Sequence, residues 1–122
     1  MRLSLALTLP LILWTPSADG AGRRAQPSRQ KAMTVSATAY CQEGRTASGM
    51  LTRPGIVAAD PRVLPLGTVM RITGPHKKYQ GTYKVADVGS AVKGRRIDIF
   101  MPSCREAKRF GRQRLQLEVL AN

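Results

Sequence analysis

Three aspartates are the side chains of this chain best suited to chemistry. Asp60, Asp87 and Asp98 each lie in a short apolar run typical of a β-strand, at residues 57–61, 85–89 and 96–100. Carboxyls held on rigid strands in a strongly basic protein indicate a polar cleft, where a carboxyl pKa can be tuned for proton transfer. The alternative is three unrelated residues that each cap a turn, and Asp before Pro61 is a common turn device.

Asp98 is the strongest candidate for an acid. If Ile97 and Ile99 face the core, strand alternation places Asp98 on the opposite face, together with Arg96 and Phe100. Burial beside an aromatic ring raises a carboxyl pKa, whereas a nearby guanidinium lowers it. The sequence leaves this competition open, and an acid role for Asp98 predicts that Arg96 points away.

The sequence offers few residues for other kinds of catalysis. The single histidine, His76, lies in a loop between Pro75 and Lys77, which is a poor setting for a Ser–His–Asp arrangement or a zinc site. No glycine-rich phosphate motif precedes a helix, and no calcium-loop spacing is present. We therefore expect no cofactor and no metal. Acid–base work by carboxyls remains, or a binding groove without chemistry.

Short strands separated by glycine and proline must position these carboxyls. We expect six strands, at residues 34–40, 56–59, 68–73, 80–86, 96–101 and 112–120. In the first, Val35, Ala37 and Ala39 share one face, and Thr38 and Tyr40 lie on the other. Six short strands with one helix favour a small closed barrel.

The helix is marked by its ends. Ser103 and Glu106 have the spacing of a capping box, in which Ser103 accepts a backbone amide and Glu106 reaches back to the cap. Gly111 can end the helix. Ala107 and Phe110 are expected to face the core.

The N-terminal segment predicts export. Residues 1–20 resemble a secretory signal peptide, with Arg2 before an apolar stretch and small residues at 18–20. The stretch is short for a membrane span, although a retained anchor is the alternative. Residues 21–32 are expected to form a flexible basic linker, and residues 33–122 the folded domain.

The two cysteines fit an exported protein. Cys41 and Cys104 are expected to form a disulfide that stabilises this small domain by roughly 2–4 kcal/mol. The alternative is a reactive thiol, but no Cys-x-x-Cys spacing is present. The net charge of +13 would attract polyanions such as carboxylated wall glycan, or would serve solubility alone. Six aromatic residues without stacking-platform spacing argue against nucleic acid as a partner.

Several segments in fixed order resemble the three-aspartate (3D) domain family, which includes the barrel of membrane-bound lytic transglycosylase A. The matching segments are Thr38-Ala39-Tyr40, Thr46-Ala47-Ser48-Gly49, Val57-Ala58-Ala59-Asp60-Pro61, Leu64-Pro65-Leu66-Gly67-Thr68, Val85-Ala86-Asp87-Val88-Gly89, Lys93-Gly94-Arg95-Arg96-Ile97-Asp98-Ile99-Phe100-Met101, Glu106-Ala107 and Phe110-Gly111. Together they are far more specific than any one alone.

This resemblance implies a mainly β fold, a six-stranded double-psi β-barrel with one short helix. It also implies non-hydrolytic cleavage of peptidoglycan between N-acetylmuramic acid and N-acetylglucosamine, giving 1,6-anhydro ends. Asp98 would be the catalytic general acid and base, and Asp60, Asp87 and Thr46 would bind substrate. The partners implied are peptidoglycan glycan strands and other anionic wall polymers, in the periplasm or outside the cell.

Two departures from the family pattern leave other functions open. Val88 stands where the family usually has threonine, so a hydroxyl expected at the cleft is absent. The second domain of the larger transglycosylases is also absent from this sequence. A non-catalytic, expansin-like wall-binding barrel and a basic polyanion-binding barrel are therefore the alternatives.

Overall fold

The computed structural model describes residues 10–13, 31–74 and 76–122. Most of the predicted signal peptide and linker therefore lies outside the described residues. The first strand begins at Ala32, which is the last residue of the predicted linker. Among the described residues, no helix combines the length and the apolar character that crossing a membrane requires.

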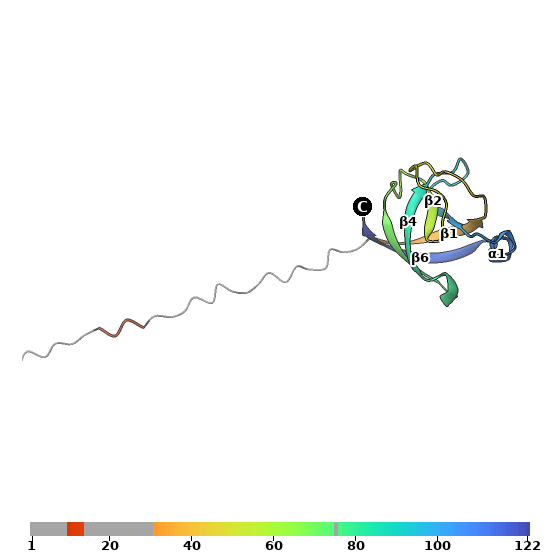
Figure 1. The fold of residues 1–122 in the computed structure, drawn as a ribbon. Coiled ribbons are helices and arrows are strands. Elements are labelled where there is room, and N and C mark those ends of the chain that lie inside the picture. The colour runs from red at the N-terminus through yellow and green to blue at the C-terminus, as the bar shows by residue number, and fades with distance from the viewer. Residues whose placement is uncertain (1–9, 14–30, 75) are drawn as a thin grey trace, which may run out of the picture.

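Six strands close into a barrel, as the sequence predicted (Figure 1). Their order around the barrel is β1-β5-β2-β4-β3-β6. Each lies within two residues of its predicted bounds: β1 Ala32–Tyr40, β2 Ile56–Ala59, β3 Val69–Thr73, β4 Gly81–Asp87, β5 Arg96–Phe100 and β6 Gln113–Ala121. The mainly β, closed-barrel fold is confirmed, and the double-psi crossing of the connections stays a prediction.

The barrel interior is filled by alternate residues of every strand. Met70 and Ile72 of β3 are fully buried, and Leu115 and Leu117 of β6 are 2% exposed. Successive strand residues point to opposite faces, so the intervening positions lie on the outside of the barrel. Ile97 and Ile99 belong to the interior cluster, which places Asp98 between them on the outer face as predicted.

The strand order brings β5 between two strands that are distant from it in sequence. β5 pairs in parallel with β1, where Asp98 lies opposite Thr38. On its other side β5 pairs antiparallel with β2, where Asp98 lies opposite Ala58. Ala58 is also the register partner of Asp87 on β4, next to a β-bulge at residues 57–58. Asp87 and Asp98 therefore flank the same residue from two sides.

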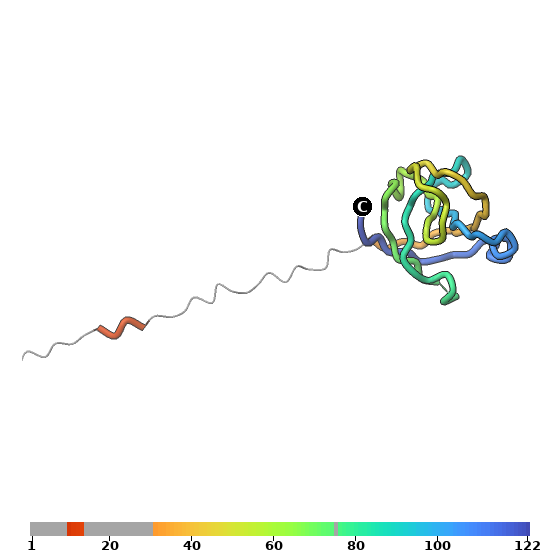
Figure 2. The backbone as a smooth tube through the Cα atoms, viewed as in Figure 1, coloured from red at the N-terminus to blue at the C-terminus, as the bar shows by residue number. Residues whose placement is uncertain are grey.

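A second, smaller apolar cluster lies on the outer face, at this end of the barrel. Ile56, Ala86 and Phe100 are buried there, and Tyr40 and Met50 pack against them. Met50 belongs to the loop of residues 41–55, which joins β1 to β2 (Figure 2). The backbone amide of Ser48 donates to the carbonyl oxygen of Ala86 at 3.1 Å, so this loop covers the outer face.

Helix α1, Cys104–Phe110, has the predicted bounds. The Ser103 hydroxyl accepts a hydrogen bond from the Glu106 backbone amide at 3.2 Å, as a capping box requires. The second half of the box does not form, because the Glu106 carboxylate pairs with Lys78 Nζ at 2.8 Å. Lys78 lies in a short 3-10 helix, η1 (Lys77–Tyr79), between β3 and β4. The ion pair thus competes successfully for the Glu106 side chain.

The predicted disulfide is present. Cys41 directly follows β1 and Cys104 is the first residue of α1, and the two are bonded across 63 residues of sequence. Ala107 and Phe110 pack into the interior cluster, as predicted. The disulfide and these two side chains hold α1 at the side of the barrel away from the C-terminus (Figure 1).

Candidate functional site

Asp98 sits at the centre of the outer face, on β5. Its carboxylate Oδ1 accepts a hydrogen bond from the Thr38 hydroxyl at 3.0 Å, and its side chain is half-buried. Thr38 was on the predicted outer face of β1 but was not assigned to the site. Only the parallel pairing of β1 with β5 brings the two side chains together.

The pKa of Asp98 is raised above its ordinary value, and burial is the main cause. The hydrogen bond from Thr38 and the positive charge of Arg96 both lower the pKa, without cancelling the effect of burial. Arg96 donates a hydrogen bond of 3.4 Å to the carbonyl oxygen of Ala91. Within the described part of the chain it forms no ion pair with Asp98. The effect of burial on the pKa of Asp98 therefore exceeds that of the Arg96 guanidinium, a balance that the sequence left open.

Asp87 lines the same pocket as Asp98. This cavity of about 180 Å³ is open to solvent and has both polar and apolar walls. Its lining residues are Tyr40, Gln42, Ala58, Asp87, Val88, Gly89, Val92 and Asp98. Two of the three predicted carboxyls thus meet in one hollow, and since strands β4 and β5 flank β2, their backbones are roughly 10 Å apart.

Asp87 also fixes the loop that covers this face. Its Oδ1 accepts hydrogen bonds from the backbone amides of Ala47 at 3.0 Å and Val88 at 2.9 Å. Its second oxygen accepts none from the described residues. Asp87 therefore has one oxygen committed to the loop and one free to face a ligand.

Tyr40 forms a wall of the pocket and was not predicted as a site residue. Its ring packs edge-on against Phe100, with centroids 5.4 Å apart. Its hydroxyl is buried and has no hydrogen-bond partner among the described residues. Burial, with smaller contributions from the charges of Asp87 and Asp98, raises the pKa of Tyr40 to about 12.

Asp60 does not line this pocket. Its side chain is 2% exposed and accepts hydrogen bonds from Arg62 and from the backbone amide of Gly94, the latter at 2.9 Å. The hydrogen bonds from the Arg62 side chain hold the pKa of Asp60 well below its usual range. The expectation that the three carboxyls share one cleft is wrong for Asp60, whose two oxygens are bonded to Arg62 and Gly94 instead. Its substrate-binding role stays a prediction.

Thr46 lies in the covering loop and is also buried. Its hydroxyl donates to the carbonyl oxygen of Met50 at 2.7 Å and lies 2.9 Å from the Ser48 hydroxyl. It neighbours Ala47, whose amide binds Asp87, but Thr46 does not line the pocket. Its substrate-binding role likewise stays a prediction.

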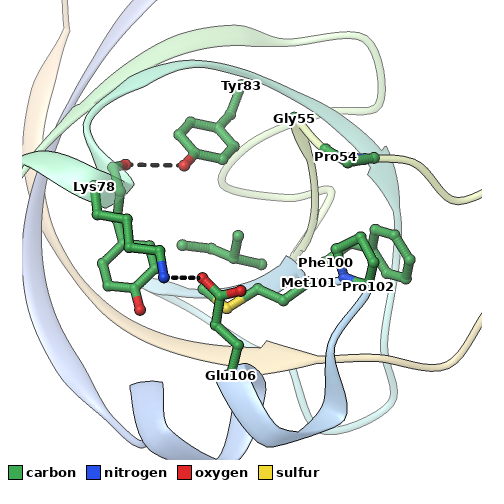
Figure 3. Close-up of a pocket in the computed structure, with 10 residues that line it drawn as sticks. Pro54, Gly55, Lys78, Tyr83, Phe100, Met101, Pro102 and Glu106 are labelled. Atoms are coloured by element: carbon green, nitrogen blue, oxygen red, sulfur yellow. Dashed lines mark hydrogen bonds and ion pairs between the residues drawn. The ribbon is translucent and has the colours of Figure 1, made fainter.

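A separate pocket of about 240 Å³ lies beside α1 (Figure 3). The ion pair of Lys78 and Glu106 spans one side of it, and the Tyr83 hydroxyl donates to the carbonyl oxygen of Tyr79 at 2.9 Å. Phe100 lines this pocket while Tyr40 lines the other. None of the three aspartates lines it.

A metal is poorly accommodated by the residues described. No group of three or more His, Cys, Asp or Glu side chains within residues 31–74 and 76–122 has the spacing of a metal site. The pocket of Asp87 and Asp98 holds two carboxyls, a phenol and an amide side chain. That set is suited to hydrogen bonding with neutral polar groups and to proton transfer.

A family model, the 3D domain, matches residues 55–121, which include all three aspartates. The chain is 35% identical over 119 residues to the putative cell wall shaping protein YabE of Bacillus subtilis, covering 87% of this chain and 28% of YabE. It is 35% identical over 99 residues to the cell wall-binding protein YocH of the same organism, covering 74% and 33%. The chain thus spans about a third of these relatives.

Solved structures share the barrel. MltA from E. coli with bound chitohexaose has a TM-score of 0.57 at 21% identity, over 66% of this chain and 28% of MltA. The Streptomyces papain inhibitor has the same TM-score at 17% identity, over 75% of this chain and 96% of the inhibitor. At these identities the likeness concerns the fold.

Proposed function

This chain belongs to the 3D domain family, and on that premise we propose that it is an exported lytic transglycosylase of the bacterial cell wall. The bond cleaved is the glycosidic bond between N-acetylmuramic acid and N-acetylglucosamine in peptidoglycan. The observation that carries this proposal is the raised pKa of Asp98 in a pocket shared with Asp87.

Asp98 acts first as an acid. Its raised pKa increases the fraction that holds a proton near neutral pH, and the protonated carboxyl donates that proton to the glycosidic oxygen as the bond to the anomeric carbon breaks. The resulting carboxylate then takes the proton of the muramyl 6-hydroxyl, whose oxygen bonds to the anomeric carbon. An internal hydroxyl replaces water, so one carboxyl serves both steps.

Asp87 supports the reaction electrostatically. Its side chain lines the same pocket, where a carboxylate stabilises the positive charge that develops on the sugar ring. The two backbone amides on its other oxygen hold the carboxylate in place. Asp87 thereby links substrate contact to the position of the covering loop.

Asp60 and Thr46 form hydrogen bonds to backbone groups near the pocket residues. Asp60 binds the amide of Gly94, four residues before Asp98, and so sets the start of β5. Thr46 closes the turn that presents the Ala47 amide to Asp87. We assign both a positioning role, which adds to the substrate-binding role predicted for each.

Cell-wall location is supported by the relatives and by the disulfide. YabE is a putative cell wall shaping protein and YocH a cell wall-binding protein. A disulfide is typical of proteins outside the cytoplasm. Peptidoglycan carries acetamido and hydroxyl groups that suit the pocket, and its carboxylates suit the net charge of +13.

A non-catalytic wall-binding barrel is the second candidate. Val88 lines the pocket where the family usually has threonine, so one hydroxyl is missing beside Asp87. A pocket with weaker hydrogen bonding to Asp98 or to substrate retains affinity for glycan more easily than it retains turnover.

Incubation of purified sacculi with the exported protein separates the two candidates. The enzyme proposal predicts soluble fragments with 1,6-anhydromuramyl ends, identified by mass spectrometry. Protein that pellets with sacculi and releases no such fragments would favour the binding barrel. Protein that pellets only at low salt, with DNA competing equally, would instead indicate a general polyanion binder.

A further inference from the structure

We propose that Tyr40 is a further substrate-contacting residue, whose hydroxyl donates a hydrogen bond to a neutral oxygen of the sugar bound between Asp87 and Asp98. This inference rests on the proposed function of the pocket and adds a residue to it. Tyr40 lies in one of the segments that resemble the family, ahead of residues 55–121, which the family model matches.

The position of the Tyr40 ring is fixed from two sides. Tyr40 is the last residue of β1 and lies opposite Phe100 of β5 in the register. The two rings meet at an interplanar angle of 62°, and Ile56, Ala86 and Met50 belong to the same apolar cluster. A ring held in this way keeps its hydroxyl at one place along the pocket wall.

The Tyr40 hydroxyl has no hydrogen-bond partner within residues 31–74 and 76–122. Buried hydroxyls are almost always hydrogen-bonded, because an unsatisfied one loses its bonds to water without replacement. Tyr83 follows this rule by donating to the carbonyl oxygen of Tyr79. Tyr40 breaks it, although it lines the same pocket as Asp87 and Asp98. The unsatisfied donor therefore lies in the wall of the pocket, closed off from bulk water, and the bound sugar would supply its acceptor.

The surroundings of Tyr40 select what it binds. With a pKa raised to about 12, the phenol keeps its proton throughout the range in which Asp98 titrates, and so remains a donor. Two carboxyls beside it disfavour a charged acceptor such as a lactyl carboxylate. A hydroxyl, ring or acetamido oxygen fits better, and the acetamido carbonyl is the strongest neutral acceptor of these sugars.

Tyr40→Phe tests the proposal, because it removes the hydroxyl and keeps the ring against Phe100. We expect an unfolding midpoint equal to or above that of the wild type, since the Tyr40 hydroxyl forms no hydrogen bond with the residues that the structure describes. We expect kcat/KM for release of anhydro fragments from sacculi, or affinity for sacculi if the protein only binds, to fall about threefold to tenfold. The shape of the pH profile should not change.

Tyr83→Phe is the matched control. It removes a hydroxyl that has a partner, so its unfolding midpoint should fall while glycan release stays at the wild-type rate. A Tyr40→Phe protein with wild-type release and affinity, or with a midpoint lowered as in the control, would overturn the role of Tyr40 alone. Wild-type protein that neither cleaves nor pellets with sacculi would overturn both the inference and the proposed function.

Discussion

At the scale of single residues, three aspartates in similar sequence settings have three different environments. Asp98 is half-buried with one hydroxyl donor, and its pKa rises. Asp60 is fully enclosed by the Arg62 guanidinium and backbone amides, and its pKa falls. The number and charge of the donors, more than burial, thus decide whether the pKa of the carboxyl falls or rises.

The raised pKa of Asp98 predicts how stability depends on pH. The folded protein binds this proton more tightly than the unfolded chain, so the resulting stabilisation is complete below the ordinary pKa of 3.8 and is lost as pH rises through the raised value. Asp98→Asn has no such proton. The free energy of unfolding of Asp98→Asn minus that of the wild type should therefore increase as pH rises from acid to neutral, as measured by urea denaturation. A constant difference would contradict the raised pKa.

The lowered pKa of Asp60 predicts the opposite dependence. Its carboxylate stabilises the fold above the ordinary pKa of 3.8, and this contribution is lost as pH falls through the lowered value. Asp60→Asn should thus have a lower thermal midpoint than the wild type at pH 7, with the gap narrowing as the solution is acidified below about pH 4. Equal midpoints at pH 7 would show that the bonds to Arg62 and Gly94 contribute nothing.

The sequence predicts the residue types of the site but not all of the residues that form it. Alternation placed Asp98 on the outer face correctly, because Ile97 and Ile99 are plainly apolar. Asp60 was grouped with the others because Arg62 and Gly94 are ordinary residues whose bonds depend on a turn and on a distant loop. Tyr40 was placed on the right face, and only the pairing of β1 with β5 reveals what it meets.

At the scale of elements, local patterns predicted each strand and the helix closely. Period-two alternation and glycine or proline boundaries are local signals, so the strand bounds followed from the sequence. The order of strands around the barrel is not local, because β5 joins β1 and β2 across more than 30 residues. That order decides which carboxyls meet.

The cap of α1 gives a prediction at this scale. Ser103→Ala removes the side-chain acceptor for the Glu106 amide and should lower the free energy of unfolding by about 1 kcal/mol, measured by urea denaturation. Glu106→Gln keeps the backbone amide and weakens only the partly exposed ion pair with Lys78, so it should lower the free energy of unfolding by less. If the second substitution costs more than the first, the ion pair and not the cap holds the helix.

At the scale of the whole molecule, the protein is small and strongly basic, and one disulfide joins an early part of the chain to a late part. The disulfide links the end of β1 to the start of α1, and β1 carries both Thr38 and Tyr40. The same bond therefore stabilises the fold and supports the strand that completes the site.

Removal of the disulfide is the prediction for this scale. Replacing Cys41 and Cys104 together by serine should lower the free energy of unfolding by about 2–4 kcal/mol, because the reduced chain regains the freedom of a loop of 63 residues. Reductant should produce the same loss in the wild type and none in the variant. Reductant that leaves the wild-type denaturation curve unmoved would contradict this contribution.

The most direct test of the account is the comparison of wild-type protein with Asp98→Asn on purified sacculi. Asn keeps the shape of the side chain and an oxygen for the Thr38 hydroxyl, but it cannot donate the proton that departure of the sugar requires. We predict fragments with anhydromuramyl ends from the wild type, at least about a hundredfold fewer from Asp98→Asn, and equal pelleting of both with sacculi. Release of these fragments by Asp98→Asn at the wild-type rate would contradict the assignment of Asp98 as the acid.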